Sequence, residues 1–158
     1  MVVVTTFNQF ERVIITDNDL STAAEFLRAY LARKLPDSLG SADWVLARGL
    51  KVAIVVTYAR PFTMRKDRFG KQEPKEMLSF LTMSLPHLGL HETVLCKRNT
   101  ISGHSDARPL HVAADGRTSI MHYDLPAFEK WEAEGLLQNV NRMRALLGTI
   151  YEATSSGQ

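Results

Sequence analysis

The chain has 158 residues, of which 45% are hydrophobic and 23% are charged, and its formal net charge is +2. This length supports one compact domain with a buried core, and the composition is typical of a soluble globular protein. The small net charge excludes a polycation, so a role in nucleic-acid binding requires basic residues gathered in one place.

Three features of the sequence limit the cellular setting that is expected for the protein. The single cysteine, Cys96, excludes an internal disulfide and any metal site built from several cysteines. The first residues, MVVVTTFNQFERVII, lack the basic and then apolar order of a secretory signal. The longest apolar run, VAIVVTYA, is far too short to cross a bilayer. We therefore expect a cytoplasmic protein without a membrane segment.

Two helices are predicted in the first part of the chain. The segment DNDLSTAAEFLRAYLARKL, residues 17–35, has apolar residues at helical spacing, and a side chain at 17–19 can cap its start. A second helix is predicted over Ser41–Tyr58, with a cap from Ser41 and Asp43. Its second half is apolar on nearly all sides, so we expect this helix to be the central, most buried one. The β-branched run 52–57 is also compatible with a strand, but the length of the segment favours a helix.

A basic segment, RPFTMRKDRFGKQEPK, follows at residues 60–75. It carries six basic residues against two acidic ones, and its prolines and glycine predict an exposed loop. Such a loop can attract RNA phosphates where the net charge of the chain does not. The alternative is a solvated surface without a ligand. The candidate RNA-binding residues are Arg60, Arg65, Lys66 and Arg68.

Two shorter helices are predicted next. KEMLSFLTMSL, residues 75–85, places three apolar residues on one face, and the following segment is expected to be helical to about Arg98. The residues expected to face inward are Met77, Leu81 and Leu85 in the first helix, and Leu88, Val94 and Leu95 in the second.

The last third of the chain changes in character. The dipeptide Asp115-Gly116 is a strong turn signal between LHVAA and RTSIMHY, which predicts a β-hairpin with His111 and His122 packed across it. Residues 125–153 predict a long amphipathic helix, and a polar tail follows from about 154. Its apolar stripe consists of Leu136, Val140, Met143, Leu147 and Ile150 or Tyr151. We therefore expect a single, mostly all-α domain over residues 1–158, a bundle of four to five helices with a small β-hairpin before the C-terminal helix.

The stretch CKRNTISGHSD, residues 96–106, carries the residues best suited to chemistry. Arg98 offers a permanently charged fork for phosphate oxygens, and the ordinary pKa of a histidine such as His104, about 6.5, allows proton exchange at neutral pH. On a continuous helix, residues six apart point about 120° away from each other. Gly103 can bend the chain between them, so the spacing leaves open whether the two side chains converge. The alternative is an ordinary polar helix end, where an arginine is stabilised by the helix dipole.

The order Arg-Asn, four residues, His in RNTISGH resembles the signature of the HEPN superfamily (higher eukaryotes and prokaryotes nucleotide-binding domains). The stretch YARPF, Tyr58–Phe62, is also similar to a stretch in members of that superfamily. The resemblance implies an all-α homodimer of toxin or antiphage-defence type that cleaves RNA without metal or cofactor, at a site composed of both protomers. It implies that His104 acts as general acid or base, that Arg98 stabilises charge on the scissile phosphate, and that Asn99 holds the pair in register. An antitoxin protein is a potential partner.

Two other functions stay open. The chain can be a non-catalytic HEPN-like module that binds RNA or nucleotide, or a partner-binding helical protein in which the motif is a coincidence. Asp106 departs from the pattern, because some HEPN toxins carry a tyrosine two positions after the histidine for modification by a partner enzyme. Regulation through that tyrosine is therefore not expected. Asp106 can instead pair with Arg98 or His104, which would raise the pKa of the histidine.

Other residues have simpler expected roles. His87 and His91 are four apart and can share a helix face, but Pro86 and Gly89 interrupt the segment and no third ligand is evident, so no metal site is expected. Cys96 is expected to be a buried structural thiol. The stripe of the last helix, including Trp131, is expected in the core or in a dimer seam.

Overall fold

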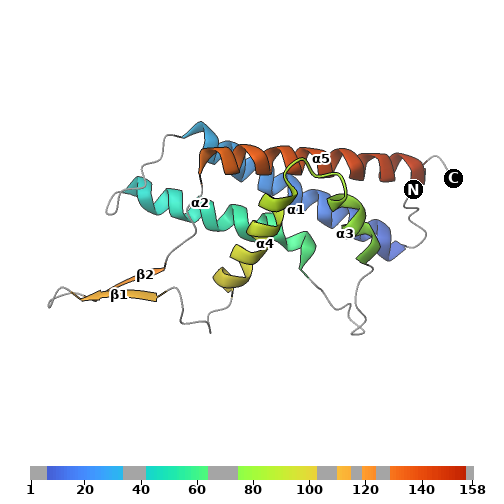
Figure 1. Ribbon diagram of the computed structural model, residues 1–158. Coiled ribbons are helices and arrows are strands. Elements are labelled where there is room, and N and C mark those ends of the chain that lie inside the picture. The colour runs from blue at the N-terminus through green and yellow to red at the C-terminus, as the bar shows by residue number, and fades with distance from the viewer. Residues whose placement is uncertain are drawn as a thin grey trace.

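The structure is a computed structural model, and it describes residues 7–33, 42–63, 75–102, 110–114, 119–123 and 129–155. This part of the chain is mostly helical, which confirms the expected all-α bundle. Its elements in chain order are α1 (Phe7–Ala32), α2 (Ala42–Ala59), the 3-10 helix η1 (Arg60–Phe62), α3 (Lys75–Thr82), α4 (Leu88–Ser102), β1 (Leu110–Ala114), β2 (Ser119–Tyr123) and α5 (Lys130–Ser155) (Figure 1).

The two longest helices, α1 and α5, lie side by side and form the body of the bundle (Figure 1). Helix α2 packs on α1, α3 packs on α5, and α4 packs against both α2 and α5. The expectation that α2 is the central, most buried helix is wrong, because the most extensive contacts between helices are those that α1 makes with α5 and α2. The buried side chains of α2 lie mostly in its second half, whereas Val45 and Leu46 in the first half are 64% and 39% exposed.

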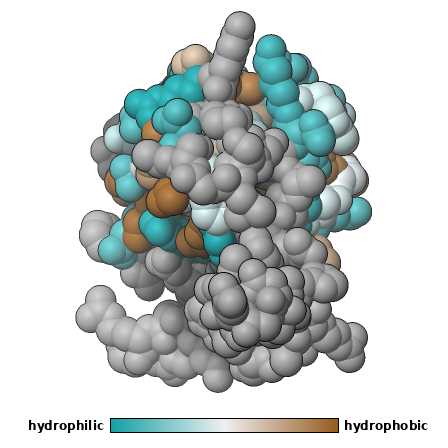
Figure 2. Space-filling model, turned by 90° about the vertical axis from the view of Figure 1, so that its left-hand side faces the viewer, coloured by the Kyte–Doolittle hydropathy of each residue, from teal (hydrophilic) through white to brown (hydrophobic). Residues whose placement is uncertain are grey.

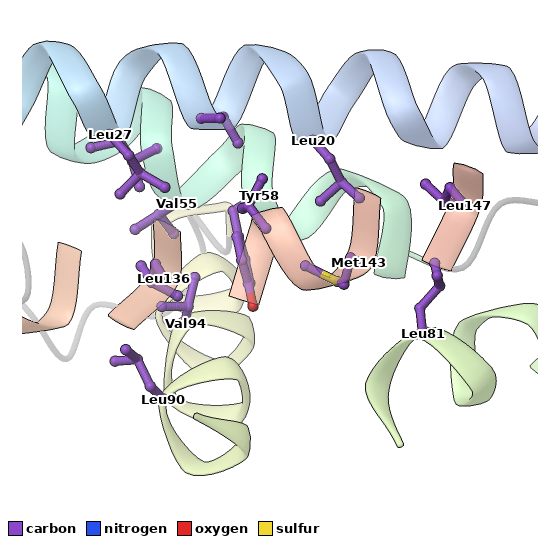
Figure 3. Packing of buried hydrophobic residues seen from close by; sticks show 14 of the residues in the cluster. Leu20, Leu27, Val55, Tyr58, Leu81, Leu90, Val94, Leu136, Met143 and Leu147 are labelled. Atoms are coloured by element: carbon purple, nitrogen blue, oxygen red, sulfur yellow. The ribbon is translucent and has the colours of Figure 1, made fainter. Parts of the chain in front are cut away.

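The core contains apolar side chains from all five helices, and Figure 3 shows part of it. Full burial of one large apolar side chain contributes about 1.5–3 kcal/mol to the stability of the fold. The predicted stripe of α5 is confirmed, and Ile150, not the 47% exposed Tyr151, completes it. Fully buried members include Leu20 and Leu27 of α1, Ile54 and Tyr58 of α2, Leu81 of α3, Val94 of α4, and Leu136 and Met143 of α5.

Helix α1 begins at Phe7, well before the predicted start at residue 17. The prediction that Asp17, Asn18 or Asp19 caps this helix is therefore wrong, because all three lie inside it. The two carboxylates have tertiary partners instead. Asp17 Oδ1 accepts a hydrogen bond from Arg144 Nε at 2.8 Å, and Asp19 Oδ1 accepts one from Arg60 Nη1 at 2.9 Å.

Helix α4 extends to Ser102, beyond the predicted end near Arg98. Its buried apolar side chains are Leu90 and Val94, whereas Leu88 is 48% exposed and was wrongly expected to face inward. Cys96 is also exposed, so the expectation of a buried thiol is wrong. Cys96 follows the buried Val94 by two positions, about 200° around the helix, which turns it away from the core.

The strands β1 and β2 pair antiparallel, with His111 opposite His122. Residues 115–118, which include the predicted Asp115-Gly116 turn, lie outside the described residues, so the predicted hairpin stays a prediction. Helix α5 continues to Ser155, which places the expected start of the polar tail inside the helix.

Candidate functional site

Arg98 and Asn99 lie side by side in the second half of α4, which supplies the helical backbone expected for the motif. Arg98 is half-buried and Asn99 is exposed, and Arg98 Nη1 donates to Asn99 Oδ1 at 3.2 Å. The ion pairs seen among the described side chains involve residues other than Arg98. Its remaining N–H groups are thus suited to an anion. His104 and Asp106 lie outside the described residues, so their approach to Arg98 stays a prediction.

Lys97, the residue before the motif, links the second half of α4 to the start of α5 through an ion pair. Lys97 Nζ lies 3.3 Å from Glu132 Oε1, and the two side chains are only 17% and 11% exposed, so solvent screens this pair less than a surface pair. The other carboxylate oxygen, Glu132 Oε2, accepts a hydrogen bond from the backbone N–H of Glu129 at 2.8 Å. Glu132 therefore caps the start of α5 and also holds the second end of α4 against it.

Sequence reasoning missed Glu132, although a local signal for half of its role was present. A glutamate at the third helical position that reaches back to the N-cap backbone N–H is one half of a capping box. The ion pair with Lys97 has no such local signal, because the two residues are 35 positions apart.

A second polar cluster is buried where α2, α4 and α5 meet. The hydroxyl of Tyr58 lies 3.0 Å from Nδ1 of His91, and Asn139 Nδ2 donates to the same hydroxyl at 3.5 Å. Asn139 also bridges the backbone of His87: its Oδ1 accepts from the N–H at 3.0 Å, and its Nδ2 donates to the carbonyl at 3.0 Å. Asn139 is completely buried, so the cluster holds the start of α4 firmly against α5.

Burial sets the protonation states in this cluster. It raises the pKa of the Tyr58 phenol far above its ordinary value, so Tyr58 keeps its proton. It also lowers the pKa of His91, against a smaller opposite effect of Glu92. Because Asn139 Nδ2 donates to the Tyr58 hydroxyl, that hydroxyl donates a hydrogen bond to Nδ1 of the neutral His91, whose own proton is then on Nε2. The ring of Phe62 stands edge-on to His91, with centroids 4.6 Å apart.

The geometry gives no support to a metal pair at His87 and His91. Nδ1 of His91 is engaged by Tyr58, and Nε2 of His87 donates to Gln138 Oε1 at 2.8 Å. No group of three His, Cys, Asp or Glu side chains in the described part of the chain is placed to hold a metal ion.

The stretch Tyr58–Phe62, at the end of α2 and in η1, makes polar contacts with α1. Arg60, whose side chain is 46% exposed, pairs with Asp19, whose side chain is 6% exposed. The carbonyl of Pro61 accepts a hydrogen bond from Arg12 Nη2 at 2.8 Å. The charge of Arg60 is thus engaged by a buried carboxylate, and its predicted contact with RNA stays a prediction. The other three candidate RNA-binding residues, Arg65, Lys66 and Arg68, lie outside the described residues.

No family model, curated protein or solved structure matches the chain. The resemblance to the HEPN superfamily therefore rests on the motif and its helical setting, and it stays a prediction.

None of the helices in the described part of the chain is both long and apolar enough to cross a membrane. An open hollow of about 500 Å³ lies between α1 and α5, with the ion pair of Asp17 and Arg144 and the exposed Tyr151 among its lining residues. This hollow lies along the C-terminal half of α5, whereas Glu132 and the end of α4 that carries Arg98 lie near the start of α5.

Proposed function

We propose that the protein is a metal-independent endoribonuclease of toxin or antiphage-defence type, acting through Arg98, Asn99 and His104 at a homodimer interface. The observation that carries the proposal is the Arg98–Asn99 pair in the second half of α4, where Arg98 is half-buried and Asn99 is exposed. Its guanidinium is oriented by the 3.2 Å hydrogen bond to Asn99 and is not neutralised by the described carboxylates. A guanidinium in this state suits a phosphodiester.

The proposed reaction needs proton transfer and charge stabilisation. The ribose 2′-OH attacks the adjacent phosphorus and the 5′-oxygen leaves, which forms a 2′,3′-cyclic phosphate and a 5′-OH. One His104 of the dimer removes the proton from the 2′-OH, and the other donates a proton to the leaving oxygen. Arg98 stabilises the charge that builds on the phosphate, and Asn99 keeps Arg98 in register.

A cleavage assay in EDTA tests this function. We expect RNA to be cut with 2′,3′-cyclic phosphate ends, and we expect both Arg98→Ala and His104→Ala to reduce the rate at least about 100-fold. Arg28→Ala is the matched control, because Arg28 is an exposed arginine on α1, and it should cut like the parent. Undiminished cleavage by His104→Ala would overturn the proposed mechanism.

The dimer has its own measurement. Sedimentation velocity should give a two-chain species for the parent protein, and cleavage should fall with dilution as dimers dissociate. A strictly monomeric protein that still cleaves RNA would contradict a site shared between protomers. RNA binding without any cleavage would favour the non-catalytic RNA- or nucleotide-binding module.

A partner-binding role is the second candidate, and the start of α2 supports it. Val45 and Leu46 are exposed there, and Figure 2 shows apolar side chains, in brown, at the surface on the side of the molecule where α2 begins. An antitoxin protein is one such partner. Val45→Ser with Leu46→Ser should weaken a partner complex while leaving RNA cleavage intact. A cytoplasmic location and a β-hairpin inserted between α4 and α5 complete the proposal.

A further inference from the structure

Trp131, in the first turn of α5, is unusually exposed for its residue type. Its exposed fraction is 64%, although tryptophan is highly buried on average. The aromatic and cation–π contacts found among the described residues do not include its ring. The other tryptophan, Trp44, is covered in part by the guanidinium of Arg48, 5.3 Å from its ring centroid. The core role expected for Trp131 is therefore wrong.

The position of Trp131 on α5 places it on the side that faces α4. Residues four and seven apart on a helix point within about 40° and 20° of each other, so Trp131 shares a stripe with Gly135 and Gln138. Gln138 Oε1 accepts a hydrogen bond from His87, and a Cβ on Gly135 would lie 2.9 Å from Leu90 Cδ2. Trp131 continues this contact stripe by one turn toward the start of α5.

Helix α4 crosses this stripe at a steep angle, and its contacts follow α5 in the opposite chain direction (Figure 1). The contacts step from His87 with Gln138, through Leu90 with Gly135, to Lys97 with Glu132. Trp131 on α5 and Arg98 on α4 are therefore at the same end of the helix pair. Figure 1 shows α4 turning away from the axis of α5, which explains why an α4-facing side chain stays uncovered.

The groups at this end suit a base beside the indole and a phosphate beside Arg98. Lys97 is held in a largely buried pair with Glu132, and Arg98 makes no ion pair with the described side chains, whereas Lys130 is 77% exposed and lies 3.7 Å from Glu134. Glu129, two positions before Trp131, is exposed and adds a negative charge at the start of α5. An uncharged, flat surface is the partner that the indole face accepts best.

We propose that Trp131 stacks on an unpaired base of an RNA strand whose neighbouring phosphate is bound by Arg98. This inference rests on the proposed function and specifies its substrate class. Bases inside a duplex are stacked on one another and present only their edges, so the substrate is single-stranded RNA or a loop. The arrangement selects a free base face and makes no choice among the four bases.

Tryptophan fluorescence and RNA anisotropy test the stacking together. In a Trp44→Phe background Trp131 is the sole tryptophan, and a labelled single-stranded RNA of about ten nucleotides should quench its emission with the same midpoint as the rise in anisotropy. The duplex of the same sequence, or inorganic polyphosphate, should leave the emission unchanged. Loss of one stacked base lowers affinity about 5- to 150-fold, which is the expected effect of Trp131→Ala.

Two controls separate this inference from the proposed function. Tyr151→Ala removes an exposed aromatic near the other end of α5 and should bind RNA like the parent. RNA binding with unchanged Trp131 emission, or with full affinity in Trp131→Ala, would overturn the stacking and leave the RNA role standing. No RNA binding by the parent would overturn both. A blue shift of Trp131 emission with protein concentration alone would place Trp131 in a dimer seam, which also overturns the stacking.

Discussion

Acidification is expected to destabilise the fold through His91. The side chain is buried with 4% exposure, and burial holds its pKa below the ordinary value of about 6.5 that the unfolded chain would show. The unfolded state therefore binds the proton first as the pH falls. The stabilising contribution of neutral His91 is complete above about pH 6.5 and is lost as the pH falls through the lowered folded-state pKa.

The local geometry explains why the folded state resists this proton. A proton on Nδ1 would face the hydroxyl proton of Tyr58 at a donor–acceptor distance of 3.0 Å. Tyr58 would have to turn its hydroxyl away, and its other polar neighbour, Asn139 Nδ2, is also a donor. A buried hydroxyl without an acceptor costs about 1–3 kcal/mol. Glu92, on α4 itself, acts in the opposite sense but less strongly than burial.

Urea unfolding between pH 7.5 and 5 measures the effect. One group contributes at most about 1.4 kcal/mol per pH unit to the slope of unfolding free energy against pH. His91→Asn removes the titration while its side-chain oxygen can still accept from Tyr58. We expect this variant to be less stable by about 0.5–3 kcal/mol at pH 7.5, because ring packing on Phe62 is lost, and to lose less stability on acidification.

His87→Asn is the matched control, because it removes a histidine at the edge of the same cluster. This control should keep the acid sensitivity of the parent. Identical pH slopes for the parent and His91→Asn would refute the reasoning, since every other titratable group is common to both proteins.

Two further predictions concern the helix contacts. Glu132→Gln removes the ion pair with Lys97 but leaves an amide oxygen for the Glu129 N–H, so we expect unfolding free energy to fall by about 1–3 kcal/mol in urea titrations, with RNA cleavage reduced through the displaced end of α4. An unchanged stability would mean that the pair does not anchor α4. Gly148→Ala should stabilise the protein by about 0.5–1 kcal/mol, because a Cβ there meets nothing within 4 Å. Gly135→Ala should not stabilise it, because its Cβ would lie 2.9 Å from Leu90, and equal melting temperatures for the two variants would contradict this packing.

Local periodicity was enough to predict α5, whose apolar residues repeat at helical spacing over many turns, and the length and cap of the second segment were enough to predict α2. Periodicity failed at the start of α1. The segment before residue 17 contains polar and β-branched residues with weak helix preference. It is helical in a fold where Val13 and Thr16 are buried and α1 packs along α5, and that information lies more than a hundred positions away.

The candidate site was likewise predicted only in part. Arg98 and Asn99 were found because their motif is local, and the helix that carries them was predicted. The cluster of Tyr58, His91 and Asn139 was not found, because its members come from three helices and two of them are 81 positions apart. Each residue taken alone is an ordinary helix residue, and only the fold makes it a partner.

These contacts divide α4 into two ends with separate anchors. His91 and the backbone of His87 fix the first end through Tyr58 and Asn139, whereas Lys97 fixes the second end through Glu132. Arg98 contributes to neither anchor. A change at the first anchor should therefore act chiefly on folding stability. A change at the second anchor should also move Arg98 relative to Trp131. It should therefore reduce RNA binding and cleavage by more than the loss of unfolding free energy explains.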